Sequence, residues 1–422
     1  MDTKGAQTGA NAVMPPYAQL FRVRAFAAIF VANALSAWGD HLARLTVAAF
    51  VLDRSGSPLA AATTLAVSLV PSLFGRSLLG PIADRFPYRH VLIVANVVRA
   101  AFVALIIVAV AGGWSLVWLL SLLFLLELAG GPAVTSMRIL LTDLFEDRRL
   151  YTRAMGLNGL SEQVNQVIGL GIGGVVVFAV GATNALWFDL ATFLLGAVVV
   201  ALTIRHRPVV GTPSAGLVGY FRDIVAGGRY LAHHRVLAAM VALGLATSWA
   251  IAAPEAVALA YAAEAGQARY GGLLMAAPMA GAVVGLLVLG RWQPRDQNGR
   301  IITMALLMPV PLLATVFQPP LLVTGLLWFV NGALQAFMLP LQATFSLMVT
   351  PEMRGRVFGL AGALTVSATG IAFLVSGLVA QQLTAAAAVS VAAVVSLGAI
   401  LLLAVRWPRR ALARAVDEVY ES

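Results

Sequence analysis

Acidic side chains are rare in this chain, and three of them stand deep inside long apolar stretches. The 422 residues include only 18 Asp and Glu, and 60% of the sequence is hydrophobic. The three acids are Asp40, Glu127 and Glu255. A carboxyl group in apolar surroundings can bind and release a proton, because burial disfavours its charged form. These acids, together with Arg44, are therefore candidates for a proton-binding site.

Asp40 and Arg44 are spaced for a pair on one helix. Arg44 follows Asp40 by four residues, so both side chains share a helix face. Asp40 stands about 14 residues into the apolar stretch that begins at residue 26, which is roughly 21 Å along a helix axis. We expect an intrahelical ion pair here. Two interpretations stay open: protonation of Asp40 releases Arg44 as a switch, or the pair is a permanent structural one.

Two other charged residues have simpler expected roles. Arg99 lies within a few turns of the end of its apolar stretch, so its long side chain is expected to extend to the membrane interface. Pairing with Glu127 or Glu162 is the alternative for Arg99. Asp189 lies near the other end of its stretch and is expected to be in contact with water.

Two sets of polar residues repeat at helical spacing. Asn158, Glu162 and Gln166 follow one another at intervals of four residues, and Asn331 and Gln335 show the same spacing. Residues four apart share one helix face. Each set is a candidate for contact with a bound substrate. The alternative is that these side chains join helices through hydrogen bonds.

The sequence lacks the residues that several kinds of catalytic and metal site require. The chain has no cysteine, which excludes disulfides, thiolate metal sites and cysteine nucleophiles. His233 and His234 are adjacent and cannot face one ion from a helix, so we expect no metal site. Neither the phosphate-binding pattern G-x-x-x-x-G-K-[ST] nor the nucleophile pattern G-x-S-x-G occurs. We therefore expect no enzymatic activity and no cofactor.

The elements that must position these residues are membrane-spanning helices. Only 11% of the residues are charged, whereas a soluble domain has about 25%. Roughly 20 apolar residues cross the hydrocarbon core of a bilayer. Twelve stretches satisfy this requirement, and we predict a transmembrane helix over each: 26–52, 58–83, 91–111, 114–141, 154–180, 183–204, 236–261, 270–290, 301–317, 321–349, 356–380 and 384–405.

The basic residues predict the orientation of these helices. If both termini are cytoplasmic, the cytoplasmic connectors and tails hold most of the 28 basic residues, and the opposite connectors hold only Arg54 and Arg269. This asymmetry is typical of the positive-inside rule. The net charge of +10 is thereby explained without a nucleic-acid partner. We expect a multi-pass protein of the cytoplasmic (inner) membrane.

A long polar gap at 205–235 divides the chain. Within it, the mixed stretch 220–234 predicts a short helix at the cytoplasmic interface. The predicted organisation is a six-helix bundle over 1–204, a central cytoplasmic loop over 205–235, and a second six-helix bundle with a short basic tail over 236–422.

The two predicted halves share a motif. The pattern R-x-x-G-L-x-G occurs at 153–159 and again at 356–362. Both copies directly follow the fourth predicted helix of their half. A match in topological register indicates duplication, and repeated halves are typical of secondary transporters.

The connector between the second and third predicted helices carries a family resemblance. It reads Gly80-Pro-Ile-Ala-Asp84-Arg85-Phe-Pro-Tyr-Arg89-His90, which resembles the signature loop of the major facilitator superfamily. Further segments are similar to the macrolide-efflux-like branch of drug:proton antiporters in that superfamily: Gly39-Asp40, Ser55–Pro58, Arg99, Gly227–His233 and Pro351–Arg356. The resemblance implies an all-α membrane fold of 12 transmembrane helices in two six-helix halves, with cytoplasmic N- and C-termini.

In that superfamily the signature loop acts as a cytoplasmic conformational latch. Its acid meets the N-terminus of a helix from the other half, where free N–H groups favour negative charge. The alternative is a solvated loop whose charges only set topology. The residues that the resemblance assigns to the latch are Gly80, Asp84, Arg85, Arg89 and Arg356.

Together these patterns predict a secondary active transporter. The expected function is proton-coupled efflux of a small amphiphilic or hydrophobic molecule by alternating access, with Asp40 and Glu127 sharing a central cavity. Alternatives are a dedicated siderophore or metabolite exporter, an importer of the same fold, or a transport-inactive receptor or scaffold. The expected partners are the substrate, protons and the lipid bilayer, and we expect a monomer.

Overall fold

The computed structural model describes most of the chain. The described residues are 17–145, 182–204, 216–292, 294–350 and 353–408, with isolated positions within 147–180 and at 411–412. The fifth predicted helix, 154–180, lies outside them apart from a few positions. All regular secondary structure in the described residues is helical, which confirms the predicted all-α class.

Before the polar gap, the helices follow the apolar stretches closely. Each begins or ends within a few residues of a glycine, proline or polar connector, because these residues terminate helices. The helices are α1 (Ala18–Phe21), α2 (Arg24–Ser55), α3 (Pro58–Arg85), α4 (Tyr88–Ala111), α5 (Leu116–Leu144) and α7 (Ala182–Thr203).

After α7, one helix lies in the gap and the others follow it. The helix expected over 220–234 is α8 (Gly216–His233), which begins four residues earlier. The later helices are α9 (Arg235–Glu264), η1 (Ala268–Tyr270), α10 (Gly271–Leu289), α11 (Pro294–Gly299), α12 (Ile301–Leu307), α13 (Val310–Leu313), η2 (Ala314–Phe317), α14 (Leu321–Leu334), η3 (Gln335–Phe337), α15 (Met338–Met348), α16 (Arg354–Gln382) and α17 (Ala385–Val405).

Two predicted helices are interrupted. The stretch 301–317 is divided into α12, α13 and η2, and the stretch 321–349 into α14, η3 and α15. Pro309 and Pro311 lie at the first break, and Pro340 follows the second. Proline lacks the backbone N–H that a continuous helix needs, so the ladder of hydrogen bonds changes at these points.

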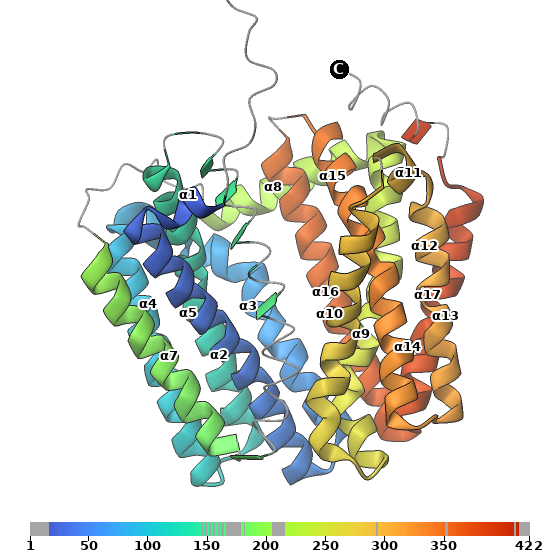
Figure 1. Cartoon of the computed structure of the whole chain (residues 1–422), viewed down its shortest axis with the longest axis horizontal. Helices are drawn as coiled ribbons and strands as arrows, with labels where there is room; N and C mark the ends of the chain where they lie inside the picture. Colours follow the sequence, from blue (N-terminus) through green and yellow to red (C-terminus); the bar gives the residue numbers. More distant parts are fainter. Residues whose placement is uncertain are drawn as a thin grey trace, which may run out of the picture.

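The helices form two groups that stand side by side (Figure 1). In the first helix group α2, α3, α4, α5 and α7 pack on one another, and in the second α9, α10, α14, α16 and α17 do so. Among the described residues, eight helices are long and apolar enough to cross a membrane. The chain is therefore a multi-pass membrane protein.

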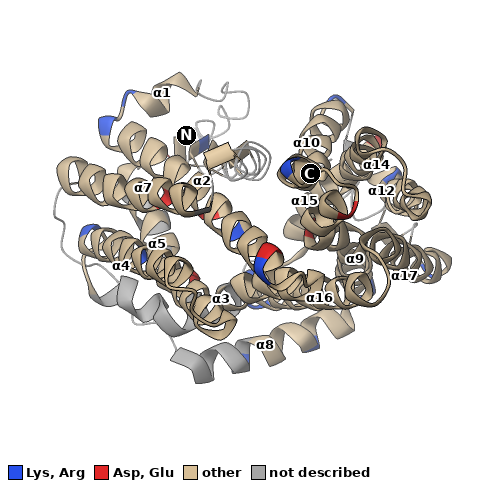
Figure 2. Ribbon diagram, turned by 90° about the horizontal axis from the view of Figure 1, so that it is seen from below, with Lys and Arg blue, Asp and Glu red and all other residues tan. Residues whose placement is uncertain are grey.

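The two ends of this assembly differ. One end carries α8 and α11 (Figure 1), and we call it the α8 end. The opposite end, where α2 leads into α3, is the far end. Helices α3 and α16 form the main contact between the groups (Figure 2). They approach each other closely at the far end, where a Cβ on Gly377 would lie 2.5 Å from Ala62 Cβ. There the Ser57 hydroxyl also donates a hydrogen bond to Gln381 Oε1 at 2.6 Å.

Helices α10 and α14 cross at close range in the second group. A Cβ on Gly281 would lie 1.9 Å from the carbonyl oxygen of Phe329, and one on Gly332 would lie 1.8 Å from that of Pro278. No side chain fits these positions. Small residues that allow backbones to approach are a common basis of helix association in membranes.

Candidate functional site

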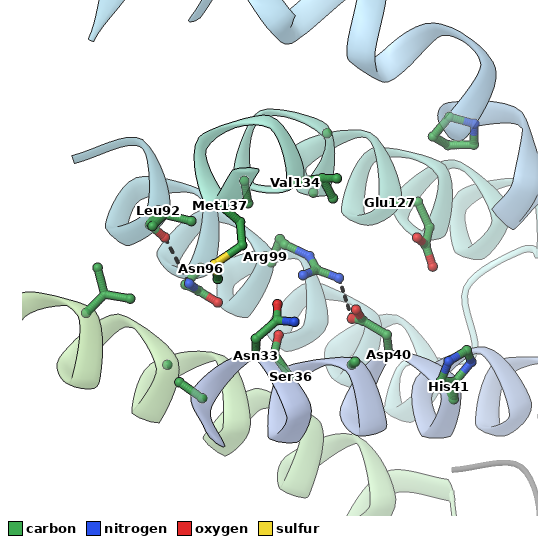
Figure 3. A pocket seen from close by; sticks show the side chains of 18 of the residues that line it. Asn33, Ser36, Asp40, His41, Leu92, Asn96, Arg99, Glu127, Val134 and Met137 are labelled. Atoms are coloured by element: carbon green, nitrogen blue, oxygen red, sulfur yellow. Dashed lines mark hydrogen bonds and ion pairs between the residues drawn. The ribbon is translucent and has the colours of Figure 1, made fainter. Parts of the chain in front are cut away.

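A cavity of about 450 Å³ lies within the first helix group (Figure 3). Helices α2, α3, α4, α5 and α7 all contribute to its wall, which mixes apolar and polar side chains. The polar and charged residues on the wall are Asn33, Ser36, Asp40, His41, Arg44, Ser68, Asn96, Arg99 and Glu127. Two of the predicted proton-binding acids, Asp40 and Glu127, therefore share one cavity.

Asp40 pairs with Arg99 of α4. Arg99 Nη2 donates a hydrogen bond to Asp40 Oδ1, and the Arg99 side chain is 10% exposed and that of Asp40 19%. The Arg99 guanidinium carbon also lies 4.2 Å from the centre of the Phe193 ring of α7, a cation–π contact. The expectation that Arg99 extends to the interface is therefore wrong. The face of α4 that carries it is turned toward α2, where Asp40 compensates its charge.

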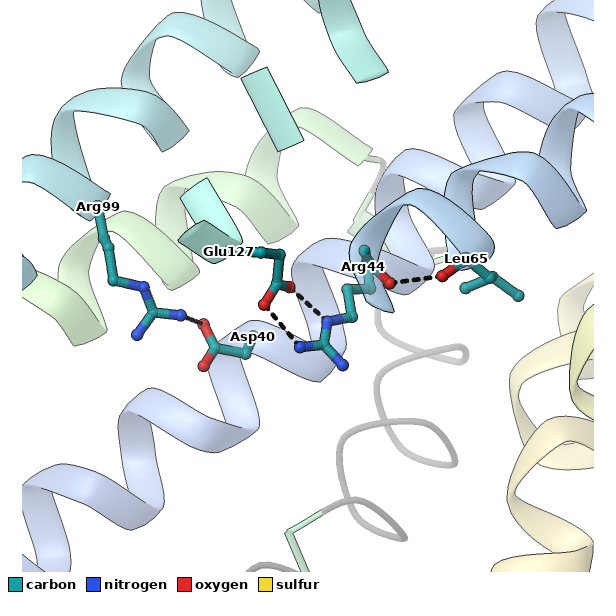
Figure 4. Close-up of polar contacts among 6 residues, drawn as sticks. Asp40, Arg44, Leu65, Arg99 and Glu127 are labelled. Carbon is teal, nitrogen blue, oxygen red and sulfur yellow. Dashed lines mark hydrogen bonds and ion pairs between the residues drawn. The ribbon is translucent and has the colours of Figure 1, made fainter. Parts of the chain in front are cut away.

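Arg44 pairs with Glu127 of α5 (Figure 4). Its Nε donates to Glu127 Oε1 at 2.5 Å and its Nη2 donates to Oε2 at 2.7 Å. The predicted intrahelical pair between Asp40 and Arg44 is therefore wrong. A glutamate on a facing helix offers both oxygens to the planar guanidinium, and such two-pronged pairs are the stronger arrangement.

Glu255 lies in α9 of the second helix group and is not among the residues that line the cavity. It is partly buried and makes no hydrogen bond or ion pair with the described residues. It lies within electrostatic reach of Arg44. Arg44 therefore interacts with an acid of its own group, Glu127, and with one of the other group.

The structure corrects the expectation for Asp189. This residue is 0% exposed, not in contact with water. Its helix, α7, packs along α2, so the side chain points into the helix pair although it lies only two turns from the end of α7. Position along a helix alone did not reveal this burial.

Only part of the predicted latch lies in the described residues. Gly80 lies in α3, and the side chains of Asp84 and Arg85 lie outside the described residues. Arg89 Nη2 donates a hydrogen bond to the carbonyl oxygen of Ala201 in α7, at 2.7 Å, so Arg89 bonds within its own helix group here. The latch itself stays a prediction.

The predicted partner of the latch, the first turn of α16, contacts α8. Arg356 is exposed at this turn. A Cβ on Gly227 of α8 would lie 2.7 Å from the Arg356 carbonyl oxygen, so the two backbones touch. Helix α8 therefore rests on the second helix group at the α8 end.

Of the two predicted polar sets, the structure describes Asn331 and Gln335 in full. Asn331 is fully buried, and its Nδ2 donates to the carbonyl oxygen of Met308 at 2.9 Å. Gln335 Nε2 donates to Asn331 Oδ1 at 3.2 Å. The bond to Met308 matches the helix-joining alternative in this conformation, whereas the bond between Gln335 and Asn331 lies along one segment. Glu162 and Gln166 lie outside the described residues.

Sequence reasoning found Asp40 and Arg44 but missed other wall residues, among them Asn33 and Ser36 of α2. Asn33, Ser36, Asp40 and Arg44 follow one another at intervals of three or four along α2, which is the spacing of one helix face. This polar face in an apolar helix was a readable signal. Asn96 of α4 lacked any comparable pattern. No cluster of three possible metal ligands occurs among the described residues.

Curated relatives of this chain include transporters. The multidrug efflux pump Tap of Mycobacterium tuberculosis (strain ATCC 25618 / H37Rv) is 26% identical over 365 residues, which cover 83% of this chain and 85% of the relative. An uncharacterised transporter of the major facilitator type from Bacillus subtilis (strain 168), YkuC, is 28% identical over 187 residues. That match covers 43% of this chain and 42% of the relative.

Solved structures share the fold. The nucleoside transporter NupG superposes with a TM-score of 0.70 at 12% identity, covering 90% of this chain and 98% of that structure. A bacterial homologue of the lysosomal transporter Spinster, in an inward-facing conformation, gives a TM-score of 0.65 at 15% identity over 94% and 98%. At these identities the likeness concerns the fold alone.

The family model of the major facilitator superfamily matches residues 27–328. The matched region contains the cavity and both acid–arginine pairs. It also contains the connector at 80–90 that carries the resemblance, and the resemblance is thereby confirmed. The chain belongs to the major facilitator superfamily.

Proposed function

We propose that this transporter is a proton-coupled exporter of small amphiphilic or hydrophobic molecules that works by alternating access. The observation that carries the proposal is the presence of two acid–arginine pairs on the wall of one cavity. Ion pairs deep in a membrane protein are costly to maintain, and they commonly mark proton or substrate pathways.

The pairs supply a physical link between protonation and conformation. While Glu127 is ionised, it neutralises Arg44 within the first helix group. When Glu127 takes a proton, Arg44 becomes a poorly compensated cation, which is unfavourable in a site of low polarity. Glu255 of α9 is an acid of the second group whose charge acts on Arg44. Protonation of Glu127 therefore favours a state in which α2 and α9 approach each other.

In the proposed arrangement the chain crosses the inner (cytoplasmic) membrane twelve times, with both termini in the cytoplasm. It is supported by the arginine asymmetry of the connectors, with Arg54 and Arg269 as exceptions. In this arrangement the α8 end is cytoplasmic, and the Ser57–Gln381 contact closes the outer end. The cavity then receives its substrate from the cytoplasmic side.

The substrate class follows from the cavity wall. Apolar side chains such as Ile29, Leu92 and Met137 alternate with the polar and charged groups, which suits a molecule with both apolar and polar surface. The relative from Mycobacterium tuberculosis is named a multidrug efflux pump, which supports a broad rather than a single cargo. No cofactor beyond the proton gradient is needed, and a monomer contains the whole cavity.

Transport by the purified chain in proteoliposomes tests this proposal. Vesicles with an acidic lumen are supplied with ethidium and a panel of neutral and cationic lipophilic dyes on the outside. We expect dye accumulation that stops when nigericin collapses the pH gradient. Accumulation that persists after nigericin treatment, or that follows a sodium gradient instead, contradicts proton coupling.

A further inference from the structure

Asp189 of α7 is a buried acid that the two ion pairs do not use. It is 0% exposed, and neither carboxyl oxygen has a hydrogen-bond partner among the described residues. The nearby Thr192 hydroxyl donates instead to the backbone carbonyl of Asp189, at 2.7 Å. In this conformation the carboxyl accepts no hydrogen bond, although the Thr192 hydroxyl lies close enough to offer one.

Asp189 lies directly against the backbone of α2 beside Asp40. A Cβ on Gly39 would lie 2.3 Å from Asp189 Oδ1 and 2.6 Å from the Thr192 hydroxyl oxygen. Only glycine fits at this position, and the residue that follows it is Asp40. The two acids are therefore neighbours across the contact between α2 and α7.

Arg99 stands beside both acids. It bonds to Asp40 through Nη2, while its buried Nε has no partner among the described residues. Its guanidinium group covers the ring of Phe193, which lies one helical turn after Asp189 on α7. A buried donor without an acceptor and a buried acid without a donor thus belong to the same cluster.

The charged groups that face Asp189 come from three helices. They are Asp40 of α2, Arg99 of α4 and, as a weaker influence, Glu127 of α5. The cluster of Asp40, Arg99 and Asp189 contains two carboxyl groups and one guanidinium. If both acids were ionised, one negative charge would be buried without compensation, which is strongly unfavourable. One proton on the cluster makes it neutral.

We propose that Asp189 is a further proton-binding site, and that Arg99 pairs alternately with Asp40 and Asp189. In the state seen here Asp189 holds the proton and Arg99 bonds to Asp40. In the alternate state the proton has left Asp189 and is bound to Asp40, and Arg99 bonds to Asp189. The O–H bond at Asp189 breaks as that at Asp40 forms, and the cluster stays neutral throughout. The role of this exchange in transport rests on the proposed function.

The two acids differ in whether the cavity reaches them. Asp40 and Arg99 lie on the cavity wall, whereas Asp189 does not. A proton on Asp189 is screened from the cavity by the other two residues. The exchange therefore moves a proton between a shielded position and one that a substrate or water in the cavity reaches.

Infrared spectroscopy of the full chain in lipid nanodiscs tests the proposal without any transport. At neutral pH, protonated carboxyl groups give a carbonyl band separate from that of carboxylates. We expect Asp189→Asn to remove one such band from the wild-type spectrum. We also expect Asp40→Asn to remove the same band, because Arg99 is then free to pair with Asp189 and the acid ionises.

The control is Asp53→Asn, which removes an exposed carboxyl near the end of α2 and is expected to leave the band intact. If Asp189→Asn does not fold, the Asp40→Asn spectrum with carbon-13 aspartate still reports on the band. A band that survives Asp189→Asn shows that Asp189 is ionised and overturns the proposal, and a band that survives Asp40→Asn overturns the exchange. A protein that shows both losses but no pH-driven transport retains this inference while the proposed function fails.

Discussion

Asp40 and Arg44 stand one turn apart on α2, yet each pairs with a different neighbouring helix. Asp40 bonds to Arg99 of α4, and Arg44 bonds to Glu127 of α5. Helix α2 is therefore joined to two neighbours by charge. Protonation of either acid changes how α2 packs against a neighbour, not merely a contact within α2.

The pair of Arg44 and Glu127 can be tested for coupling by a double-mutant cycle. Glu127→Gln leaves the Arg44 cation without its counter-charge, and we expect a loss of about 2–3 kcal/mol of stability, below the full value for a buried pair because Arg44 is 26% exposed. Arg44→Gln is expected to cost a similar amount. The double variant should lose clearly less than the sum, as measured by unfolding in mixed micelles. Additive losses would show that the two residues do not stabilise each other.

The crossing of α10 and α14 predicts a contrast between two glycines of one helix. At Gly332 a Cβ would lie 1.8 Å from the carbonyl oxygen of Pro278, whereas at Gly325 it meets nothing within 4 Å. We expect Gly332→Ala to destabilise the protein by about 1–3 kcal/mol or more, because the helices must separate. Gly325→Ala, the matched control, should be neutral or slightly stabilising, since alanine favours helix. Equal melting temperatures for the two variants would contradict the close crossing.

The far-end contact predicts that a link between α3 and α16 stops transport. The chain has no native cysteine, so Ser57→Cys with Gln381→Cys supplies the only thiols. We expect a short bis-methanethiosulfonate reagent, which forms a disulfide with each cysteine, to link them efficiently, because the native side chains are hydrogen-bonded. Linked protein should not transport, and reductive cleavage should restore activity. Each single cysteine variant serves as its control, and full transport by linked protein would show that the far end need not open.

How far the sequence predicted this architecture is clear from α2. Its boundaries and the depth of Asp40 followed from the apolar length alone, because the bilayer thickness sets both. The partners of Asp40 and Arg44 did not follow, because they depend on how α4 and α5 are rotated about their axes. Rotation is set by packing between helices, and one chain without relatives carries no direct signal of it.

The same limit explains Asp189 and the interrupted helices. Asp189 looked accessible by its position in the sequence, but its burial depends on Gly39 of another helix. The break after α12 was visible in principle, because Pro309 and Pro311 stand inside the apolar stretch. Counting apolar residues ignores the missing N–H groups of proline, and so a single helix was predicted there.

Glu255 predicts a separation of stability from function. It makes no hydrogen bond or ion pair with the described residues, so we expect Glu255→Gln to leave the melting temperature nearly unchanged. If Arg44 turns toward Glu255 during the transport cycle, the same variant should lower the rate of pH-driven transport several-fold. Transport rate and melting temperature are measured on one preparation of each variant. Glu264→Gln, which changes an acid at the end of the same helix, is measured in the same way for comparison. Unchanged transport would exclude Glu255 from the cycle.

The most direct test of the account is proton movement itself. In proteoliposomes with a pH-sensitive dye inside, addition of a transported substrate should move protons in the wild-type protein. The account predicts that Asp40→Asn combined with Glu127→Gln abolishes this proton movement, while substrate still exchanges across the membrane without a pH gradient. Substrate-dependent proton flux at the wild-type rate in the double variant would contradict the assignment of coupling to the two acid–arginine pairs.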